Sequence, residues 1–289
     1  MANRTLIVTV SLMMQLSFNA VQDVDANIYN DAGSGLNYST DVDLIQSQQT
    51  DITESVTDDL ILTDESYQNP EVEIPEEEIN RENTREIDPN KPMIALTYDD
   101  GPSKYTLEIL NLLKENNSAA TFFVLGSQVE KYEEAVIQII EDGYQIGNHS
   151  YDHKRLTALN DEELYDEINK TDKLIYESAL YRTSVMRPPY GSTSEALSEK
   201  IQKPIIKWSI DTRDWESRNA EAITEIILKN VKDGDIILMH DLYESSLEAS
   251  KVVIPELIRR GFQLVTISEL SENREVTLKA GQSYYHMYK

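Results

Sequence analysis

The chain of 289 residues carries 52 acidic and 26 basic side chains, which gives a formal net charge of −26. This excess of negative charge argues against non-specific nucleic-acid binding, which needs a basic face. The chain has no cysteine, so disulfides, thiolate metal sites and cysteine nucleophiles are excluded. Its length suits one large domain with an appended segment.

The first 20 residues are predicted to form a signal peptide or a membrane anchor. Arg4 supplies a short basic start, an apolar run spans residues 6–18, and Ala20 offers a small residue at a cleavage position. The run is too short to cross a bilayer comfortably. We therefore expect an exported bacterial protein that is secreted or associated with the cell surface, with an uncleaved anchor as the alternative.

Residues 21–90 form an acidic segment with 19 acidic and two basic side chains. Polar residues dominate it, and its only aromatic residues are Tyr29, Tyr38 and Tyr67. Such a composition cannot bury enough apolar surface to offset the entropy of ordering, so the segment is predicted to be a disordered linker. It would hold the following domain, residues 91–289, near a membrane or a cell wall.

From residue 91 onward, short apolar runs alternate with amphipathic helical patterns. The runs predict strands at residues 93–98, 119–125, 144–147, 184–187, 205–210, 235–239 and 262–266. The intervening patterns predict helices at residues 104–114, 127–142, 161–181, 194–202, 220–232 and 245–260. This alternation indicates an α/β fold, a distorted (β/α) barrel of about seven parallel strands with helices outside. Active sites of such barrels lie where the strands end.

Two adjacent carboxylates, Asp99 and Asp100, follow the first predicted strand, and Gly101 and Pro102 then force a turn. Acidic side chains at the mouth of a buried strand are costly unless they act together. One of them can hold a metal ion while the other remains free as a base. The alternative is a plain turn, because the sequence DDGP is also favourable turn chemistry.

Three of the four histidines also follow predicted strands. His149 and His153 come after the third strand, four residues apart, and one helical turn would place them on the same face. Two imidazoles and one carboxylate form a three-ligand site typical of catalytic zinc and of some non-haem iron centres. His240 follows the sixth strand, where it is either a general acid opposite the metal or a structural histidine. No chemistry is assigned to the fourth histidine, His286, in the C-terminal tail.

Arg187 ends the fourth predicted strand and precedes two prolines, which restrict the backbone and would hold its side chain at the mouth of the barrel; the alternative is a stiff loop without that role. An arginine beside a carboxylate lowers the pKa of that carboxylate and keeps it ionised. After the fifth strand come Asp211, Asp214 and Trp215. Trp208, inside that strand, is predicted to lie in the core, whereas Trp215 either walls a pocket and stacks on a sugar ring or belongs to the core.

Five of these stretches, in this order, resemble the motifs of the polysaccharide deacetylase family, the NodB homology domain of carbohydrate esterase family 4. The resemblance covers residues 91–266 and rests on TYDDGP (97–102), HSYDH (149–153), RPPYG (187–191), DTRDW (211–215) and LMH (238–240). The chain departs from the family's common pattern at Lys154, where a proline often stands, and at Tyr98, where phenylalanine is frequent. Neither change removes a functional atom, so an active enzyme is expected.

The resemblance implies catalytic roles for residues of four motifs. Asp99 would be the base, Arg187 would orient it, and His240 would be the acid that protonates the leaving group. For the two acids of the fourth motif, we predict that Asp211 partners His240 and that Asp214 supports Arg187.

The resemblance also implies one divalent metal ion, with zinc as the first choice and cobalt or nickel as alternatives. Its ligands would be Asp100, His149 and His153. The predicted substrate-binding groups are the backbone N–H of Tyr190, which would help to hold the oxyanion, and the side chains of Trp215 and Leu238, which would enclose the acetyl methyl group.

The implied activity is metal-dependent hydrolysis of N-acetyl groups on N-acetylglucosamine units of a polysaccharide, either peptidoglycan or chitin-like oligomers. Peptidoglycan is the first choice because the chain is predicted to be exported and tethered, and a monomer is expected. Three alternatives remain: an O-acetyl xylan esterase that uses the same residues, a non-haem iron oxygenase, and a non-catalytic cell-wall carbohydrate-binding protein. The oxygenase has no need of Asp99, Arg187 and His240, and the binding protein would be expected to lack one of the ligands or His240.

Overall fold

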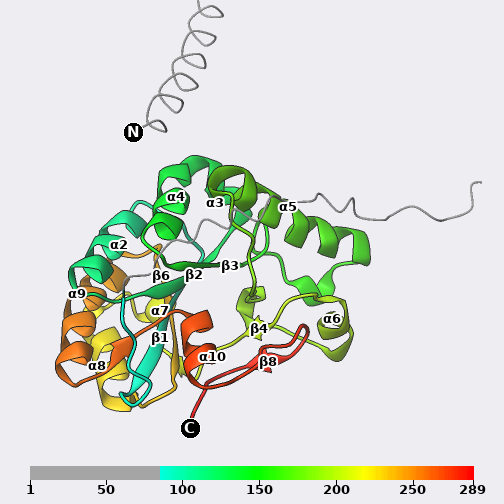
Figure 1. Ribbon diagram of the computed structural model, residues 1–289. Coiled ribbons are helices and arrows are strands. Elements are labelled where there is room, and N and C mark those ends of the chain that lie inside the picture. Colours follow the sequence, from blue (N-terminus) through cyan, green and yellow to red (C-terminus); the bar gives the residue numbers. More distant parts are fainter. Residues whose placement is uncertain (1–84) are drawn as a thin grey trace, which may run out of the picture. The chain divides into compact units, whose positions relative to one another are not determined.

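The computed structural model describes residues 85–289 (Figure 1). The predicted signal peptide or anchor and most of the predicted acidic linker, residues 1–84, lie outside the described residues. Within the described part, no helix is both long and apolar enough to cross a membrane. The described residues include the whole of the predicted domain, residues 91–289.

The main sheet has five parallel strands in the order β3-β2-β1-β6-β5, and a sixth, β7, pairs with the start of β1. Their bounds are β1 Met93–Asp99, β2 Ala120–Val124, β3 Gln145–Asn148, β5 Ile210–Asp211, β6 Ile236–His240 and β7 Gln263–Leu264. The central strand β1 is buried along its whole length. Its nearly continuous apolar run is typical of a parallel strand that is covered on both faces.

A smaller sheet continues the barrel beyond β3. Met186 bridges in parallel to Asn148 at the end of β3 and to Ile205 at the start of β4. The strand β4 (Ile205–Ile206) then pairs with β8 (Ser283–Tyr284), so the C-terminal tail supplies an additional strand. The architecture is a distorted (β/α) barrel, as the sequence predicts.

Helices cover the outside of the barrel in the alternating order that the sequence predicts (Figure 1). The longer ones are α2 Thr106–Glu115, α4 Glu133–Glu141, α5 Asp161–Ala179, α8 Ala220–Asn230 and α9 Glu244–Arg259. Helix α9 packs against α8 and α2, and α5 packs against α4 and the short α3 (Gly126–Val129). A capping box starts α5, because Asn160 and Glu163 each accept the other's backbone N–H.

Some predicted elements differ from the observed ones. The predicted strand 205–210 is two short strands, because Lys207 between them gives its carbonyl to the Arg187 side chain rather than to a neighbouring strand. The predicted strand 184–187 contributes only the Met186 bridges. The predicted helix 127–142 is divided into α3, a 3-10 turn (Glu130–Tyr132) and α4, and the helix α10 (Ile267–Asn273) was not predicted.

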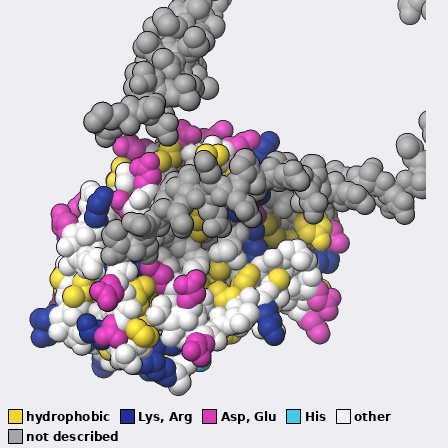
Figure 2. Space-filling model, in the orientation of Figure 1, with side chains coloured by type: hydrophobic (Ala, Val, Ile, Leu, Met, Phe, Trp, Pro, Cys, Tyr) yellow, Lys and Arg dark blue, Asp and Glu magenta, His cyan; other side chains and the backbone are white. Residues whose placement is uncertain are grey.

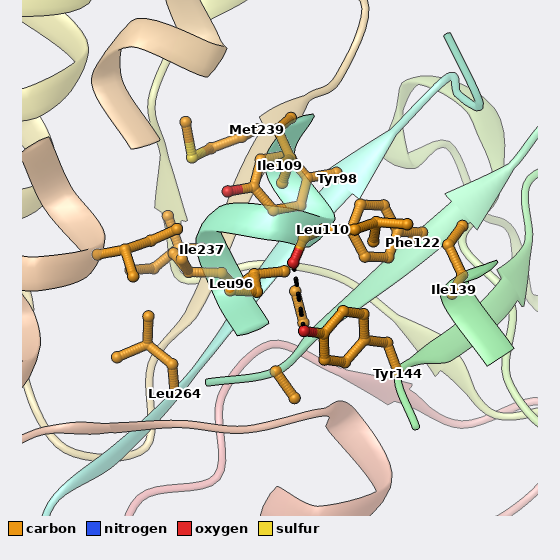
Figure 3. Packing of buried hydrophobic residues seen from close by; sticks show 14 of the residues in the cluster. Leu96, Tyr98, Ile109, Leu110, Phe122, Ile139, Tyr144, Ile237, Met239 and Leu264 are labelled. Atoms are coloured by element: carbon orange, nitrogen blue, oxygen red, sulfur yellow. Dashed lines mark hydrogen bonds between the residues drawn. The ribbon is translucent and has the colours of Figure 1, made fainter. Parts of the chain in front are cut away.

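The largest hydrophobic cluster lies between the sheet and the helices around α2, α4 and α9 (Figure 3). The ring of Tyr98 on β1 stacks on that of Phe122 on β2, with centroids 5.3 Å apart, and its hydroxyl lies 2.9 Å from that of Ser250. The Tyr144 hydroxyl donates to the carbonyl of Leu110, so its polar end is also satisfied. This packing fixes β1, the strand that ends at the first functional carboxylate.

Candidate active site

A pocket of about 370 Å³ opens at the carboxyl ends of β1, β3, β5 and β6, where the barrel architecture predicts the active site. Most of the site residues predicted from the sequence line it, namely Asp99, Asp100, His149, His153, Tyr190, Asp211, Trp215, Leu238 and His240. The other two, Arg187 and Asp214, are fully buried and reach the pocket through Asp99 and His240. The lining also includes three residues that were not predicted there: Gly191, Trp208 and Tyr243.

Three potential metal ligands converge beside the end of β1. The Oδ1 atom of Asp100 lies 3.2 Å from Nε2 of His149 and 3.3 Å from Nε2 of His153. One ligand atom from each residue lies within 4.8 Å of the others. Asp100 Oδ1 is buried and makes no hydrogen bond in the described part of the chain. A divalent cation among the three would give this oxygen a partner, so the donor set fits a metal ion.

The charges of this cluster favour metal binding. Burial opposes ionisation of Asp100, but His149 and the other site histidines lower its pKa to about 2. Burial outweighs the attraction of the carboxylates at His153 and lowers the pKa of its imidazole, which therefore stays neutral near pH 7. At His149 burial is outweighed by the charges of Asp99 and Asp100, which raise its pKa. The surroundings of His149 Nε2 therefore favour a positive charge, whether a proton or a metal ion carries it.

A loop brings the two histidines together, rather than the helical turn that their spacing suggested. Ser150 and His153 have left-handed backbone conformations, with φ of 69° and 63°, and residues 149–153 are not helical. The Nδ1–H of His149 donates to the carbonyl of Arg187 at 2.5 Å. This bond selects the tautomer that leaves Nε2 to face Asp100 and a metal ion.

Glu167 on α5 holds this loop in place, and the sequence-based prediction missed it. Its buried carboxylate accepts the backbone N–H groups of Tyr151 and Asp152 at 2.9 and 3.1 Å. It also accepts from the ammonium of Lys154 at 2.8 Å. A signal was present in the sequence, because Glu167 lies at helical spacing with Leu164 and Ile168, on the apolar face of the predicted helix.

Replacing Glu167 with glutamine is expected to weaken metal binding about 10- to 100-fold, the usual loss when an outer partner of a metal site is removed. Glutamine keeps the size of the side chain but loses the charge that binds Lys154 and the two loop N–H groups. Titration of the metal-free protein with Zn²⁺ measures the change. Glu177→Gln, at an exposed position of the same helix, is the matched control. Equal affinity in the two variants would contradict this role of Glu167.

Asp99 is held by a buried arginine, as predicted. Arg187 Nη1 donates to Asp99 Oδ1 at 2.6 Å and to the hydroxyl of Thr97 at 2.7 Å. Its Nε and Nη2 donate to the carbonyls of Ile206 and Lys207 at 3.0 and 2.9 Å. The guanidinium is completely buried, so these contacts give it a single position and orient Asp99.

The second oxygen of Asp99 lies next to the metal-ligand cluster. Asp99 Oδ2 is 3.7 Å from Nε2 of His149. In the β1–β6 ladder, Asp99 is directly in register with His240. One carboxylate therefore borders both the three-ligand cluster and His240, the last residue of β6.

The acid that partners His240 is Asp214, so the predicted pairing with Asp211 is wrong. Asp214 Oδ1 lies 2.8 Å from His240 Nδ1. Its Oδ2 accepts from the backbone N–H of His240 at 2.7 Å and from the hydroxyl of Ser246 at 2.6 Å. Asp211 instead accepts from the backbone N–H of Arg213 at 2.8 Å and lines the pocket.

The path of the chain after β5 explains why Asp214, and not Asp211, partners His240. Asp211 is the last residue of β5, whereas Arg213 takes a left-handed conformation with φ of 51°. This turn directs α7 (Asp214–Ser217) against β6, so Asp214 contacts His240. The predicted support of Arg187 by Asp214 is therefore also wrong, and the carboxylate partner of Arg187 is Asp99.

Asp214 keeps His240 protonated. Burial opposes the positive charge, but the hydrogen bond and the charge of Asp214 raise the pKa of His240 to about 9. Since Nδ1 faces Asp214, the proton on Nε2 is the one that can be donated to a substrate. The pair has the properties of a general acid that is active at neutral pH.

Asp214→Asn is expected to shift the alkaline limb of the pH–activity profile to lower pH. An acid catalyst works only while it is protonated, so activity falls as the pH rises through the pKa of His240, about 9 in the native protein. Without the Asp214 charge, this pKa drops back by about 1 to 2 units towards the ordinary histidine value. The profile of kcat/KM against pH measures the shift. An alkaline limb at the native position would contradict the pairing.

Aromatic side chains surround the mouth of the pocket. Trp215 is 47% exposed and Tyr190 59% exposed, so neither belongs to the core. Tyr190 has φ of 60°, and its ring meets that of His153 edge-on with centroids 4.6 Å apart. Trp208, predicted in the core, is half-buried: it packs against a hydrophobic cluster and also lines the pocket next to Gly191.

Lys207 connects the mouth loop to the buried arginine, and the sequence-based prediction missed it. Its buried ammonium donates to the carbonyl of Gly191 and lies 3.3 Å from the hydroxyl of Thr193. Its own carbonyl accepts from Arg187. Burial and the nearby Arg187 charge lower the pKa of Lys207 to about 8. A lone charged residue inside the apolar run 205–210 was the available signal.

The sequence matches the polysaccharide deacetylase family over residues 86–204. It is 41% identical over 187 residues to the peptidoglycan-N-acetylmuramic acid deacetylase PdaC of Bacillus subtilis, a match that covers 64% of this chain and 40% of that protein. It is 42% identical over 193 residues to the peptidoglycan-N-acetylglucosamine deacetylase PgdA of Listeria monocytogenes, covering 66% of this chain and 41% of that protein. The match thus spans about two fifths of the length of these curated relatives.

Two solved structures resemble the described fold. That of peptidoglycan deacetylase PdaC from Bacillus subtilis is 40% identical, with a TM-score of 0.64 and coverage of 65% of this chain and 94% of that one. That of a family 4 acetyl xylan esterase from Clostridium thermocellum, in complex with a cobalt ion, is 29% identical, with a TM-score of 0.65 and coverage of 68% and 100%. The chain belongs to the polysaccharide deacetylase family, which confirms the resemblance read from its motifs.

Proposed function

We propose that the protein is a metal-dependent hydrolase that removes N-acetyl groups from N-acetylglucosamine units of a polysaccharide, with peptidoglycan as the substrate. The observation that carries this proposal is the position of Asp99. It is bound by Arg187 and borders both the three-ligand cluster and His240. A base and an acid beside a metal site are the groups that amide hydrolysis requires. The names of PdaC and PgdA both support peptidoglycan as the substrate, and that of PgdA supports N-acetylglucosamine units, whereas PdaC is named for N-acetylmuramic acid.

The metal ion would be held by Asp100, His149 and His153, and zinc is proposed because two imidazoles and a carboxylate suit it. A bound divalent ion lowers the pKa of a water molecule and polarises the acetyl carbonyl. The protein's contribution is to aim the three ligand atoms at one point and to surround that point with negative charge. The low pKa of Asp100 and the bond from His149 to the Arg187 carbonyl serve this purpose.

Asp99 takes the proton of the attacking water. Its Oδ1 accepts from Arg187, so Oδ2, the oxygen beside the metal ligands, is the atom that receives the proton. The buried guanidinium gives Asp99 a charged hydrogen-bond partner on the side away from the metal ligands. The Arg187 contacts also stop the carboxylate from rotating away, which keeps the transfer distance short.

His240 gives its Nε2 proton to the leaving nitrogen, so that a free amine departs with acetate. Asp214 holds the ring by Nδ1 and stabilises the imidazolium before the transfer. The backbone N–H of Tyr190 donates to the oxyanion that forms on the acetyl carbon. Trp215 and Leu238, both in the pocket lining, enclose the acetyl methyl group.

Lys207→Met is expected to lower kcat for an N-acetylglucosamine oligomer about fivefold, with a smaller change in KM. The substitution removes the ammonium that holds the Gly191 carbonyl, so the loop that carries the Tyr190 N–H, the proposed oxyanion donor, loses about 1 kcal/mol of restraint. Asp99 and His240 keep their partners, so the two proton transfers are preserved. Steady-state kinetics separate the two parameters. A rise in KM with an unchanged kcat would contradict a role in positioning the oxyanion donor.

An O-acetyl xylan esterase is the second candidate, because the esterase of Clostridium thermocellum has a similar fold. The two functions are separated by acetate release from N-acetylglucosamine oligomers and from acetylated xylan, measured at equal concentrations of acetyl groups. We expect the higher kcat/KM with the amide substrate. Acetate from xylan alone would assign the protein to the esterases.

An export signal or anchor in residues 1–20 would place the domain at the cell wall, where this substrate is found. A monomer would suffice for the reaction, because every proposed catalytic group and metal ligand comes from one chain. Fractionation of cells that produce the full chain tests this location. Recovery of the protein in the cytoplasmic fraction would argue against it.

A further inference from the structure

An arginine with a fixed position lies on one side of the pocket. The Arg155 guanidinium stacks over the ring of Tyr190, 4.6 Å from its centroid, and donates to the hydroxyl of Ser192 at 3.2 Å. Tyr190 lines the pocket, and the edge of its ring meets the imidazole of His153. Arg155 is thus one side chain away from a proposed metal ligand, at an exposed position.

A second arginine has a matching position near the general acid. The Arg218 guanidinium lies 3.2 Å from the centroid of the Tyr243 ring, and its Nε donates to the carbonyl of Trp215 at 2.8 Å. Tyr243 and Trp215 both line the pocket, and the Tyr243 ring lies 5.9 Å from that of His240. His153 and His240 therefore each have a pocket tyrosine beside them, with an arginine stacked on that tyrosine.

Neither arginine has a carboxylate partner in the part of the chain that the structure describes. Five of the eight arginines in residues 91–289 pair with a carboxylate of the described residues, whereas Arg155, Arg182 and Arg218 do not, and of these three only Arg155 and Arg218 stack on a tyrosine of the pocket lining. The neighbouring Arg213 pairs with Glu216, and Arg259 and Arg260 both pair with Glu256. On the face shown in Figure 2, acidic and basic side chains are likewise interspersed. Arg155 and Arg218 keep their charge available at the pocket.

We propose that Arg155 and Arg218 bind carboxylate groups of the glycan, so that the enzyme selects acidic N-acetylated strands over neutral ones. This inference rests on the proposed deacetylase function and specifies its substrate. A guanidinium binds a carboxylate through two parallel N–H groups, and stacking on a tyrosine limits the freedom lost on binding. Peptidoglycan offers two such groups, the lactyl carboxylate of muramic acid and the carboxylates of the stem peptide. Chitin-like oligomers have none.

The test compares acetate release by the zinc-loaded full chain from three sets of glycan fragments. The first carries the free lactyl carboxylate without peptide, the second has that carboxylate converted to a methylamide, and the third carries the stem peptide on the lactyl group. For the wild type we expect kcat/KM about tenfold higher with the free acid than with the methylamide. In the double variant Arg155→Gln/Arg218→Gln, the ratio of kcat/KM for the free acid to kcat/KM for the methylamide should fall close to one. Most of this fall should come from a higher KM for the free acid.

The third set identifies which carboxylate is bound. A preference over the methylamide that is confined to peptide fragments indicates the peptide carboxylates, because the lactyl group is then an amide. An equal preference for both acidic sets indicates that either carboxylate can be bound. A preference confined to the free lactyl acid indicates that group. Each of these results supports recognition of a carboxylate by the two arginines.

Two control variants separate recognition from general damage. Arg182 also stacks on a tyrosine, Tyr176, at 4.6 Å, but Tyr176 does not line the pocket, unlike Tyr190 and Tyr243, so Arg182→Gln should keep the wild-type ratio. The double variant Arg155→Lys/Arg218→Lys retains the charges and should keep part of the preference. A wild type without preference, or an unchanged ratio in the double glutamine variant, would overturn the inference while deacetylation still stands. No acetate from any fragment would overturn the proposed function and this inference with it.

Discussion

Replacing Asp99 with asparagine is expected to lower kcat about 100-fold or more, the usual scale for loss of a general base. The amide keeps the shape of the side chain but cannot take a proton from water at the position of Oδ2. The metal ligands Asp100, His149 and His153 are unchanged, so the metal content should equal that of the wild type. Acetate release and metal content, measured on the same preparation, check both parts of this prediction.

The same substitution removes one charge of a buried ion pair, so its stability must be measured as well. Arg187 is completely buried, and breaking such a pair costs about 3 to 5 kcal/mol. Activity is therefore compared well below the unfolding temperature of the variant. Asp161→Asn, which removes a surface carboxylate paired with Lys200, is the control. Normal turnover by Asp99→Asn would show that another group is the base.

His149→Ala is expected to lose both the metal ion and the activity. Its imidazole is almost fully buried and is one of only three protein ligands in the proposed site. Removal of an outer partner of a metal site already costs up to about 100-fold in affinity, so the loss of a ligand should exceed that. Metal titration and acetate release measure the two effects.

His286→Ala is the matched control for this variant. His286 stacks on Tyr288 in the C-terminal tail and is not part of the pocket lining. We expect it to bind metal and release acetate like the wild type. If His149→Ala kept its full metal content and rate, the metal ion would have to be bound elsewhere.

Most of the site could be predicted because parallel strands bring their carboxyl ends together. Asp99 and His240 are far apart in the sequence, but each ends a strand, and the β1–β6 ladder places them side by side. The same reasoning located Asp100 and His149 at the ends of β1 and β3. Strand order need not be known for this prediction, since all strand ends open to one side of a barrel.

The pairing of Asp211 and Asp214 could not be predicted because it depends on one backbone turn. Both residues follow β5, and their types are identical. The left-handed conformation of Arg213 decides which of them reaches His240. This conformation could not be predicted, because arginine rarely adopts it and its presence in a sequence does not indicate it. The helical-turn interpretation of His149 and His153 was wrong for the same reason, since a loop with two left-handed residues joins them.

Glu167 and Lys207, which support the site, were not predicted, although the sequence contained a signal for each of them. Glu167 and Lys207 are charged side chains at buried positions, one in a helix and one in an apolar run. A buried charge needs partners, so each was a candidate for holding a loop. Their partners are mainly backbone groups of distant segments, and only the fold shows which ones.

The most direct test of the central claim is acetate release from N-acetylglucosamine oligomers by the purified full chain. The rate is measured as isolated, after removal of metal with a chelator, and after addition of Zn²⁺. We predict release that the chelator abolishes and zinc restores, with one free amine formed for each acetate. Release that chelation leaves unchanged would contradict a metal site at Asp100, His149 and His153. No release by the zinc-loaded protein from these oligomers or from peptidoglycan would contradict the deacetylase function.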